Sequence, residues 1–169
     1  MKKCLIDYVK RGAFDELYTP EYAVYPVLDA IFSSNTVIWC PFDTENSNIV
    51  KVLQSKGLKV IHSHISEGKD FFQYEPDEHY DMIVSNPPYS IKDQVLERCY
   101  QLRKPFALLL PITALEGTKR GKLFKDKGLD LIVLDKRVDF NGKGKCWFNT
   151  SWFCWCTPID GIQFSTIDK

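Results

Sequence analysis

Four consecutive residues near the middle of the chain, Asn86-Pro87-Pro88-Tyr89, combine an amide, two prolines and an aromatic ring. They directly follow Met82-Ile83-Val84, an apolar run that predicts a buried strand. Proline ends such a strand, and a residue that precedes proline is held in an extended conformation. Asn86 is therefore expected to project from a rigid strand end, which we call the ledge (residues 85–90). An amide, proline carbonyls and an aromatic face together suit the binding of a planar group.

Three other segments place polar side chains where predicted elements begin or end. Tyr18-Thr19-Pro20 begins a predicted helix that extends to about Ser33, with Thr19 as N-cap and Pro20 as first helical residue. Residues 40–46 cover the end of a predicted strand and the loop after it, and Asp70-Phe71 lies in a polar stretch. A helix start fully explains the Thr-Pro pair, and the alternative is that this corner also lines a ligand pocket.

Apolar patterning predicts the elements that position these segments. The expected strands are residues 36–41, 58–65, 80–85, 106–111, 129–135, 146–156 and 162–164, with residues 70–72 as a further, very short candidate. The expected helices are residues 2–17, 20–33, 49–57, 91–103 and 117–128. This alternation predicts one α/β domain over residues 1–169, with a doubly wound, mostly parallel sheet of about seven strands and an antiparallel last strand. We expect no separate target-recognition domain. Ligands of such sheets bind at the carboxyl ends of the strands, where the ledge and residues 40–46 both lie.

Asn86-Pro87-Pro88-Tyr89 resembles the catalytic motif of S-adenosylmethionine-dependent amino-methyltransferases. Over residues 17–156 the chain is most similar to small phage-type DNA N6-adenine methyltransferases. The resemblance implies a class I methyltransferase (Rossmann-like) fold and S-adenosylmethionine as cofactor. It implies catalytic roles for Asn86, Pro87, Pro88 and Tyr89. The cofactor-binding residues that it implies are Tyr18, Thr19, Pro20, Cys40, Pro41, Asp43, Glu45, Asp70 and Phe71.

The chemistry that the resemblance implies agrees with the residue types of the ledge. An exocyclic amine that is conjugated to an aromatic ring is a poor nucleophile. The Asn86 side-chain oxygen and the Pro87 carbonyl would accept hydrogen bonds from the two N–H groups of the amine. They would thereby orient the nitrogen lone pair and stabilise the positive charge that develops on nitrogen. No strong general base is needed, and Tyr89 would stack on the planar group.

The loop at residues 40–46 departs from the family pattern. Thr44 and Asn46 stand where glycines are expected, and Cys40 stands where an acidic residue is expected. Asp43 or Glu45 could replace that acid. Glycine serves in such a loop to adopt positive φ, which threonine tolerates poorly. A non-catalytic methyltransferase-fold protein that binds nucleic acid or a partner protein is therefore the alternative function.

The charge distribution favours an anionic partner. Residues 103–145 hold 11 Lys/Arg and 5 Asp/Glu, a net charge of +6, whereas residues 1–102 have a net charge of −5. Lys143 and Lys145 could follow phosphates while Trp147 and Phe148 stack on a base; the family places a base-holding aromatic residue at this aromatic pair. We expect DNA as the partner, ahead of an RNA base and of a protein glutamine amide. A solvated lysine-rich surface would explain the same charges.

Cysteine and histidine patterns indicate no metal site and no disulfide framework. The six cysteines include no C-x-x-C pair, and Cys154 and Cys156 would share one face of a strand. His62-Ser63-His64 lies where the family has an acid that binds the cofactor ribose, and two histidines are a weak metal signal. The chain has no apolar run of membrane-spanning length and no signal-peptide core. We expect a cytoplasmic protein in a reducing compartment, without membrane partners.

Overall fold

The computed structural model describes residues 18–142 and 148–168. The helix expected over residues 2–17 lies outside these ranges, as do the expected substrate-binding residues Lys143, Lys145 and Trp147.

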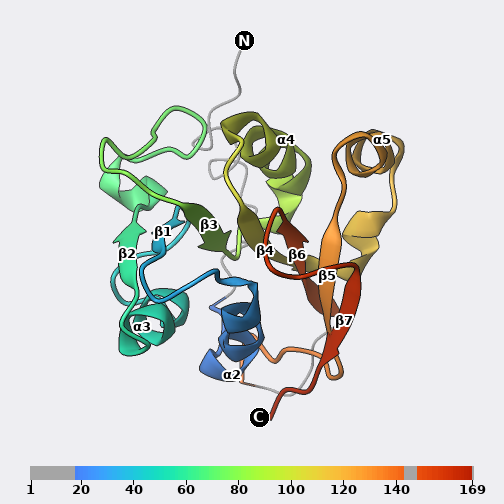
Figure 1. Cartoon of the computed structure of the whole chain (residues 1–169), viewed down its shortest axis with the longest axis horizontal. Helices are drawn as coiled ribbons and strands as arrows, with labels where there is room; N and C mark the ends of the chain where they lie inside the picture. Colours follow the sequence, from blue (N-terminus) through green and yellow to red (C-terminus); the bar gives the residue numbers. More distant parts are fainter. Residues whose placement is uncertain (1–17, 143–147, 169) are drawn as a thin grey trace.

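Within the described ranges, seven strands form one sheet in the order β2-β1-β3-β4-β6-β5-β7 (Figure 1). The strands are β1 Val37–Cys40, β2 Lys59–His62, β3 Met82–Ser85, β4 Phe106–Pro111, β5 Asp130–Leu134, β6 Thr150–Trp155 and β7 Ile162–Ser165. Among these strands only β6 runs antiparallel to its neighbours, β4 and β5. The expected mostly parallel sheet is confirmed, and its antiparallel strand is β6. β6 is inserted between β4 and β5, while β7 pairs in parallel with β5.

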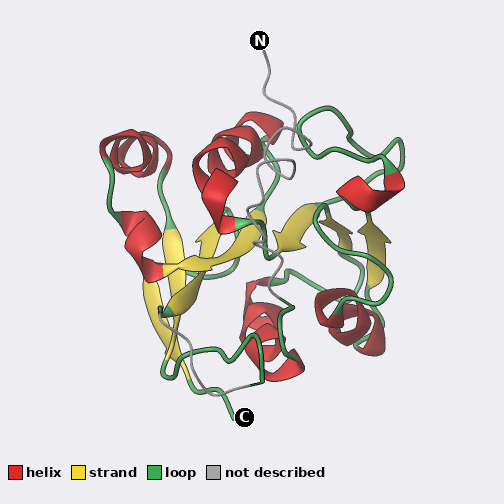
Figure 2. Ribbon diagram, turned by 180° about the vertical axis from the view of Figure 1, so that it is seen from behind, coloured by secondary structure: helices red, strands yellow, loops and turns green. Residues whose placement is uncertain are grey.

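Helices cover both faces of the sheet (Figures 1 and 2). α2 Glu21–Val24, the 3₁₀ segment η1 Tyr25–Ala30 and α3 Asn48–Ser55 lie on one face, and α4 Lys92–Leu102 and α5 Thr118–Lys127 lie on the other. The buried core splits in the same way. Trp152 belongs to the cluster under α2 and α3, and Trp39 belongs to the cluster under α4. This is the doubly wound α/β architecture that the patterning predicted.

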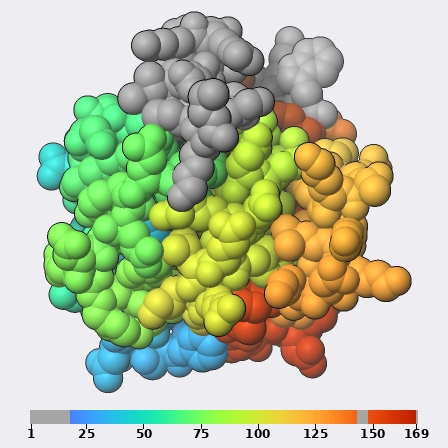
Figure 3. All heavy atoms as spheres, turned by 90° about the horizontal axis from the view of Figure 1, so that it is seen from above, coloured from blue at the N-terminus to red at the C-terminus, as the bar shows by residue number. Residues whose placement is uncertain are grey.

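The central strands are buried because both of their faces are covered. All six residues of β4 and all four residues of β3 are buried. Seen from above, α4 lies between the segment that precedes β3 and α5 (Figure 3). α5 has no buried residue, so its lysines form an exposed outer face.

Two segments differ from the expected elements. The helix expected over residues 20–33 changes at Tyr25 from α to 3₁₀ and ends at Ala30. Pro26 at the start of the 3₁₀ segment has no N–H to donate, which accounts for the break in the α-helical ladder. The strand expected at residues 70–72 is a turn, because the main-chain carbonyl of Asp70 accepts from Gln73 N and Tyr74 N at 2.8 and 2.7 Å.

Cys154 and Cys156 do not share a face, contrary to expectation. Cys154 is buried in β6, whereas Cys156 follows the end of the strand and is exposed. Its φ of 50° lies in the left-handed region and not in the extended region of a strand.

α3 ends as its sequence predicts. Gly57 has φ of 79°, its N–H donates to Gln54 O at 2.9 Å, and Leu58 N donates to Leu53 O at 3.2 Å. These two bonds are those of a Schellman motif, in which glycine adopts the left-handed conformation without steric cost.

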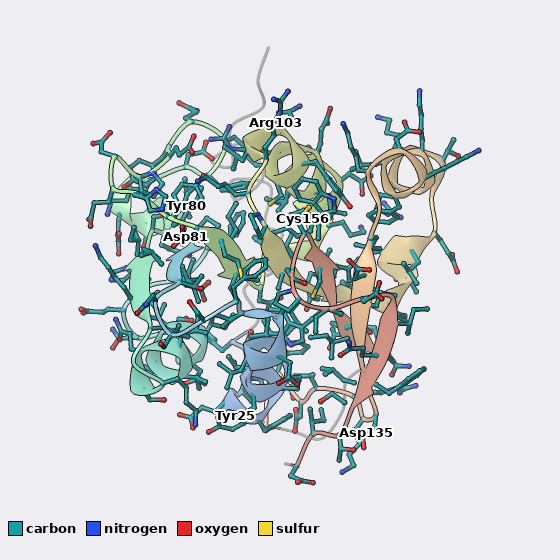
Figure 4. The ribbon with its side chains drawn as sticks, in the orientation of Figure 1. Tyr25, Tyr80, Asp81, Arg103, Asp135 and Cys156 are labelled. Carbon is teal, nitrogen blue, oxygen red and sulfur yellow. The ribbon has the colours of Figure 1, made fainter. Side chains whose placement is uncertain are left out.

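β1 and β3 are neighbours although β2 separates them in sequence. Asp81, which Figure 4 marks with Tyr80 at the entry to β3, fixes their amino ends. Its carboxylate accepts from Val37 N at 2.8 Å, and its own N–H donates to Val37 O at 2.8 Å. The backbone bond from Val37 and the bond to His79 lower the pKa of Asp81. The strand order reverses between β1 and β3, so the loops that follow these strands leave the sheet side by side.

Candidate active site

The ledge leaves the sheet at this reversal point. Ser85, the last residue of β3, is fully buried, Pro87 is buried, and Asn86 and Tyr89 are half-buried. Asn86 Nδ2 donates a hydrogen bond to Thr19 Oγ1 at 3.0 Å. The amide therefore has a defined orientation at the carboxyl end of a central strand.

Thr19 does not cap the helix that follows it, so the N-cap prediction is wrong. The first bond of α2 runs from Ala23 N to Pro20 O at 3.0 Å, and no side chain caps this end. Instead, the Thr19 hydroxyl binds Asn86, and the Thr19 carbonyl accepts from Asn48 Nδ2 at 2.9 Å. Thr19 thus joins the N-terminal corner to the ledge and to the first residue of α3.

The loop after β1 is tied to the ledge through a buried carboxylate. Asp43 is 7% exposed, and its two oxygens accept hydrogen bonds from Ser85 Oγ and Ser47 Oγ. Burial raises the pKa of Asp43, while the two hydroxyl bonds and the nearby His64 and His62 lower it in part. Because both oxygens bind serines, Asp43 holds the two loops together.

The same loop needs no glycine. Thr44 and Asn46 have no positive φ, and a turn closes between them when Ser47 N donates to Thr44 O at 3.0 Å. Glu45 and Asn46 are exposed on this turn. The missing glycines therefore impose no backbone strain here.

The end of β2 is bonded to the same loop. Ser63 N donates to Cys40 O at 3.1 Å, and Asp43 N donates to Ser63 O at 3.2 Å, which prolongs the pairing of β1 and β2. Ser63 Oγ also accepts from Trp39 Nε1 at 2.9 Å. The neighbouring His64 accepts from Ser66 N through Nδ1 and caps the short segment η2 Ile65–Glu67.

Asp70 is held within its own turn. It is 6% exposed, and its carboxylate accepts from Phe72 N at 3.0 Å and from Gln73 Nε2 at 3.3 Å. The Phe71 ring is fully buried, 4.9 Å from the Phe42 ring and 5.2 Å below the Arg98 guanidinium. Phe71 therefore anchors the turn, and only its main chain could contact a ligand.

Three aromatic rings lie beside one another at the end of the ledge. The Tyr89 ring is 5.5 Å from Phe148 and 6.5 Å from Phe140, edge to face, and Phe140 and Phe148 are 6.1 Å apart. Phe148 was expected near the ledge on the family resemblance. Sequence reasoning missed Phe140. The only sign of it in the sequence is that an aromatic residue occurs in the polar loop after β5.

Several of the expected cofactor-binding residues take no part in the side-chain hydrogen bonds that connect Thr19 and Asp43 to the ledge. Cys40 and Pro41 are buried, and burial, with the charge of Asp43, raises the pKa of the Cys40 thiol. Tyr18 is 77% exposed, and Pro20 is half-buried.

The serines and Asn48 that tie the loops were also missed as functional residues, since isolated Ser and Asn residues carry no sequence signal. In residues 18–142 and 148–168 no three His, Cys, Asp or Glu side chains cluster as metal ligands. No helix of the described chain has the length and hydropathy to span a membrane.

No protein-family model matches the chain, and no curated protein matches it. Solved structures share its fold. One is a modification subunit assigned to a type I restriction enzyme from Vibrio vulnificus, with TM-score 0.57, 13% identity, and coverage of 98% of this chain and 50% of that one. The chain therefore spans about half the length of that structure.

Two further structures are less similar. A release factor-specific protein-(glutamine-N5) methyltransferase from Alicyclobacillus acidocaldarius has TM-score 0.43 and 15% identity, and covers 79% of this chain and 89% of its own. A protein described as a predicted O-methyltransferase from Agrobacterium tumefaciens has TM-score 0.42 and 8% identity, with coverage of 86% and 84%.

Proposed function

We propose that this chain transfers a methyl group from S-adenosylmethionine to an exocyclic amine, with adenine N6 in DNA as the favoured acceptor. One observation carries the proposal. Asn86 follows the buried strand β3 at the point where the strand order reverses, and its amide is oriented by Thr19. Asp43, in the loop after β1, is bonded to the preceding residue, Ser85. An amide held in this way at a ligand-binding edge is suited to orienting one planar amine.

The residues at this edge fit the cofactor in charge and in hydrogen bonding. S-adenosylmethionine would supply the methyl group, activated by its positive sulfonium. Asp70 presents a carboxylate, fixed by its own turn, that can accept the amino group of the cofactor adenine. The buried Asp43 adds negative charge next to the ledge, which complements a cation. His62-Ser63-His64 stands where the family has the acid that accepts hydrogen bonds from the ribose hydroxyls, and the Ser63 hydroxyl is buried against Trp39, so this segment offers no carboxylate to the ribose.

The ledge performs the chemistry by accepting hydrogen bonds. Asn86 Oδ1 and the Pro87 carbonyl would each accept a hydrogen bond from one N–H of the amine. These bonds would turn the nitrogen lone pair out of conjugation with the ring and direct it toward the methyl group. The Pro87 carbonyl belongs to the backbone and the Asn86 amide is held by its bond to Thr19, so little reorganisation accompanies the reaction. As nitrogen becomes positive, the same two oxygens stabilise it, and its extra proton passes to solvent. The Tyr89, Phe140 and Phe148 rings would hold the planar base by stacking and edge contacts.

Charge supports nucleic acid as the substrate class. The net charge of +6 over residues 103–145 includes the exposed lysines of α5. Arg120 of α5 binds Asp93 in the first turn of α4, the helix that follows the ledge. A structural neighbour that is a modification subunit is consistent with DNA as the acceptor. An RNA base and a protein glutamine amide present the same kind of nitrogen, and they are the other acceptors that the ledge could serve.

Two measurements test the proposal in sequence. Calorimetry with S-adenosylmethionine should detect binding at or below millimolar concentration. Transfer of a labelled methyl group should then be measured with unmethylated DNA, with RNA and with a release factor, and we expect DNA to be labelled fastest. Absence of cofactor binding at millimolar concentration would refute the enzymatic proposal, and faster labelling of RNA or release factor would refute the choice of DNA.

The second candidate is a non-catalytic protein of this fold that binds nucleic acid or a partner protein. The observation that favours it is the combination of a buried Cys40 in place of the family acid and a histidine pair in place of the ribose-binding acid. This candidate predicts that the protein binds no cofactor and, where its ligand is nucleic acid, that it retains DNA in a filter or mobility-shift assay. The calorimetric result therefore separates the two candidates directly.

A further inference from the structure

We propose that Thr19 is a positioning residue for Asn86: its hydroxyl oxygen accepts from Asn86 Nδ2 and so directs the amide oxygen toward the reacting amine. The inference rests on the proposed function, because it requires Asn86 to receive an amine. It differs from the role that the family resemblance implies for Thr19, which is contact with the cofactor.

The contacts of Thr19 point away from a simple helix-capping role. Its side chain is bonded to Asn86 at 3.0 Å, and the residue is only 6% exposed, so water competes little for this bond. α2 starts without a side-chain cap. The hydroxyl therefore serves the ledge and not the helix that its sequence context predicts.

The amide of Asn86 needs an acceptor in its productive orientation. When Oδ1 receives an amine N–H, Nδ2 points the other way and requires an acceptor of its own. The Thr19 hydroxyl can donate or accept, so it accepts in this orientation. Removal of the hydroxyl would leave Nδ2 without this acceptor. The amide would then have less preference for the orientation in which Oδ1 faces the amine over the flipped orientation in which Nδ2 faces it.

The threonine itself is held in place from several directions. Asn48 Nδ2 donates to its carbonyl at 2.9 Å. The helix that follows is fixed when Trp152 Nε1 donates to Ala23 O at 2.9 Å and when Asp139 N donates to Tyr22 Oη at 2.8 Å. These bonds come from α3, from β6 and from the loop after β5, so the acceptor offered to Asn86 is rigid.

Removal and restoration of the hydroxyl test the role. Thr19→Val keeps the shape and loses the acceptor, whereas Thr19→Ser keeps the acceptor. Thr36→Val is the matched control, because Thr36 is 5% exposed and its hydroxyl accepts from Ser33 N at 3.2 Å at the amino end of β1. kcat and the KM for S-adenosylmethionine are measured with unmethylated DNA. The side-chain amide signal of Asn86 is followed by ¹⁵N NMR and assigned by its loss in Asn86→Ala.

A positioning role predicts a defined pattern. Thr19→Val should lower kcat by about 10- to 100-fold with little change in KM for the cofactor, and Thr19→Ser should stay within a few-fold of the wild type. The Asn86 amide signal should shift in Thr19→Val and stay in place in Thr36→Val. A rise in KM for S-adenosylmethionine with unchanged kcat would overturn the proposal in favour of a cofactor contact. Equal losses of kcat in Thr19→Val and Thr36→Val would also overturn it.

The two readouts separate this inference from the proposed function. If the wild-type protein methylates neither DNA, RNA nor release factor, the proposed function fails. An Asn86 signal that still shifts only in Thr19→Val would then support Thr19 as the group that orients the amide. An unchanged signal would refute that orientation whatever the activity.

Discussion

Asp43 is the residue whose ionisation is most closely linked to the shape of the site. Its carboxylate lies between the loop after β1 and the ledge, bonded to Ser47 and Ser85. Burial raises its pKa above the ordinary value of 3.8, so folding favours the protonated form. The stability gained from this group is complete below the unfolded-state pKa and is lost as pH rises through the folded-state pKa.

Asp43→Asn should therefore stabilise the protein at neutral pH, because the variant removes a buried charge and keeps polar atoms for both serines. Urea unfolding of the two proteins at about pH 7 and about pH 4 measures the difference. The advantage of the variant should shrink toward the acid end, because the raised pKa makes wild-type Asp43 take up a proton as the pH falls. Asp77→Asn, at an exposed position, is the control. An advantage that is constant or that grows on acidification would contradict this assignment.

At the level of residues, sequence reasoning identified the groups that project from the ledge. It named Thr19 and Asp43 as cofactor-binding residues but did not predict that their side chains hold the ledge. Asn86 was predictable because two prolines following an apolar run end a strand locally. Its partner Thr19 lies 67 residues away, and Asp43 and Ser85 are 42 residues apart. Such pairs arise from the strand order, which no local pattern specifies. The location of Phe71 in the core was missed for the same reason.

Among the elements, two glycines have opposite roles, one just after the end of α3 and one inside α5. Gly57 ends α3 with φ of 79°, and a Cβ added there would meet no atom within 4 Å. Gly121 lies inside α5, is exposed, and also has open space around a Cβ. Steric contacts are therefore matched, and backbone conformation alone distinguishes the two positions.

Gly57→Ala should destabilise the protein by about 1 kcal/mol, because alanine must adopt the left-handed conformation. Gly121→Ala should stabilise it by about 0.5–1 kcal/mol through the helix propensity of alanine. Equilibrium urea unfolding measures both. A loss of stability in Gly121→Ala, or no change in Gly57→Ala, would contradict the helical conformation of Gly121 within α5 or the left-handed end of α3.

The elements were predicted well where the pattern is local and less well where it depends on pairing. The apolar run 106–111 specified a strand buried on both faces, and Gly57 specified the end of α3. The insertion of β6 between β4 and β5 could not be read from sequence, since strand order is set by interactions between residues distant in the chain. Pro26 offered a local signal for the break between α2 and η1 that the expected helix over residues 20–33 did not take into account.

For the whole molecule, the separation of charge should control association with nucleic acid. Lys122 and Lys125 are exposed on α5, in the part of the chain with net charge of +6. Lys51 and Lys56 are exposed on and after α3, in the half with net negative charge. The two pairs are matched in residue type and exposure.

Replacement of Lys122 and Lys125 by Gln should weaken DNA binding and reduce the slope of log K against log salt by about 1 for each lysine–phosphate interaction that the change removes. The same change at Lys51 and Lys56 should leave the slope unchanged. Fluorescence anisotropy with a labelled duplex across a salt series makes the comparison. Equal effects of the two double variants would show that α5 is only a solvated outer face.

The measurement that tests the central claim most directly is labelled-methyl transfer by Asn86→Ala beside the wild type, with S-adenosylmethionine affinity measured on the same samples. Asn35→Ala, at an exposed position at the amino end of β1, serves as the matched control. We predict that Asn86→Ala loses transfer by at least about 100-fold while its cofactor affinity and thermal stability stay close to those of the wild type. Transfer at the wild-type rate in Asn86→Ala would contradict a catalytic role for the ledge.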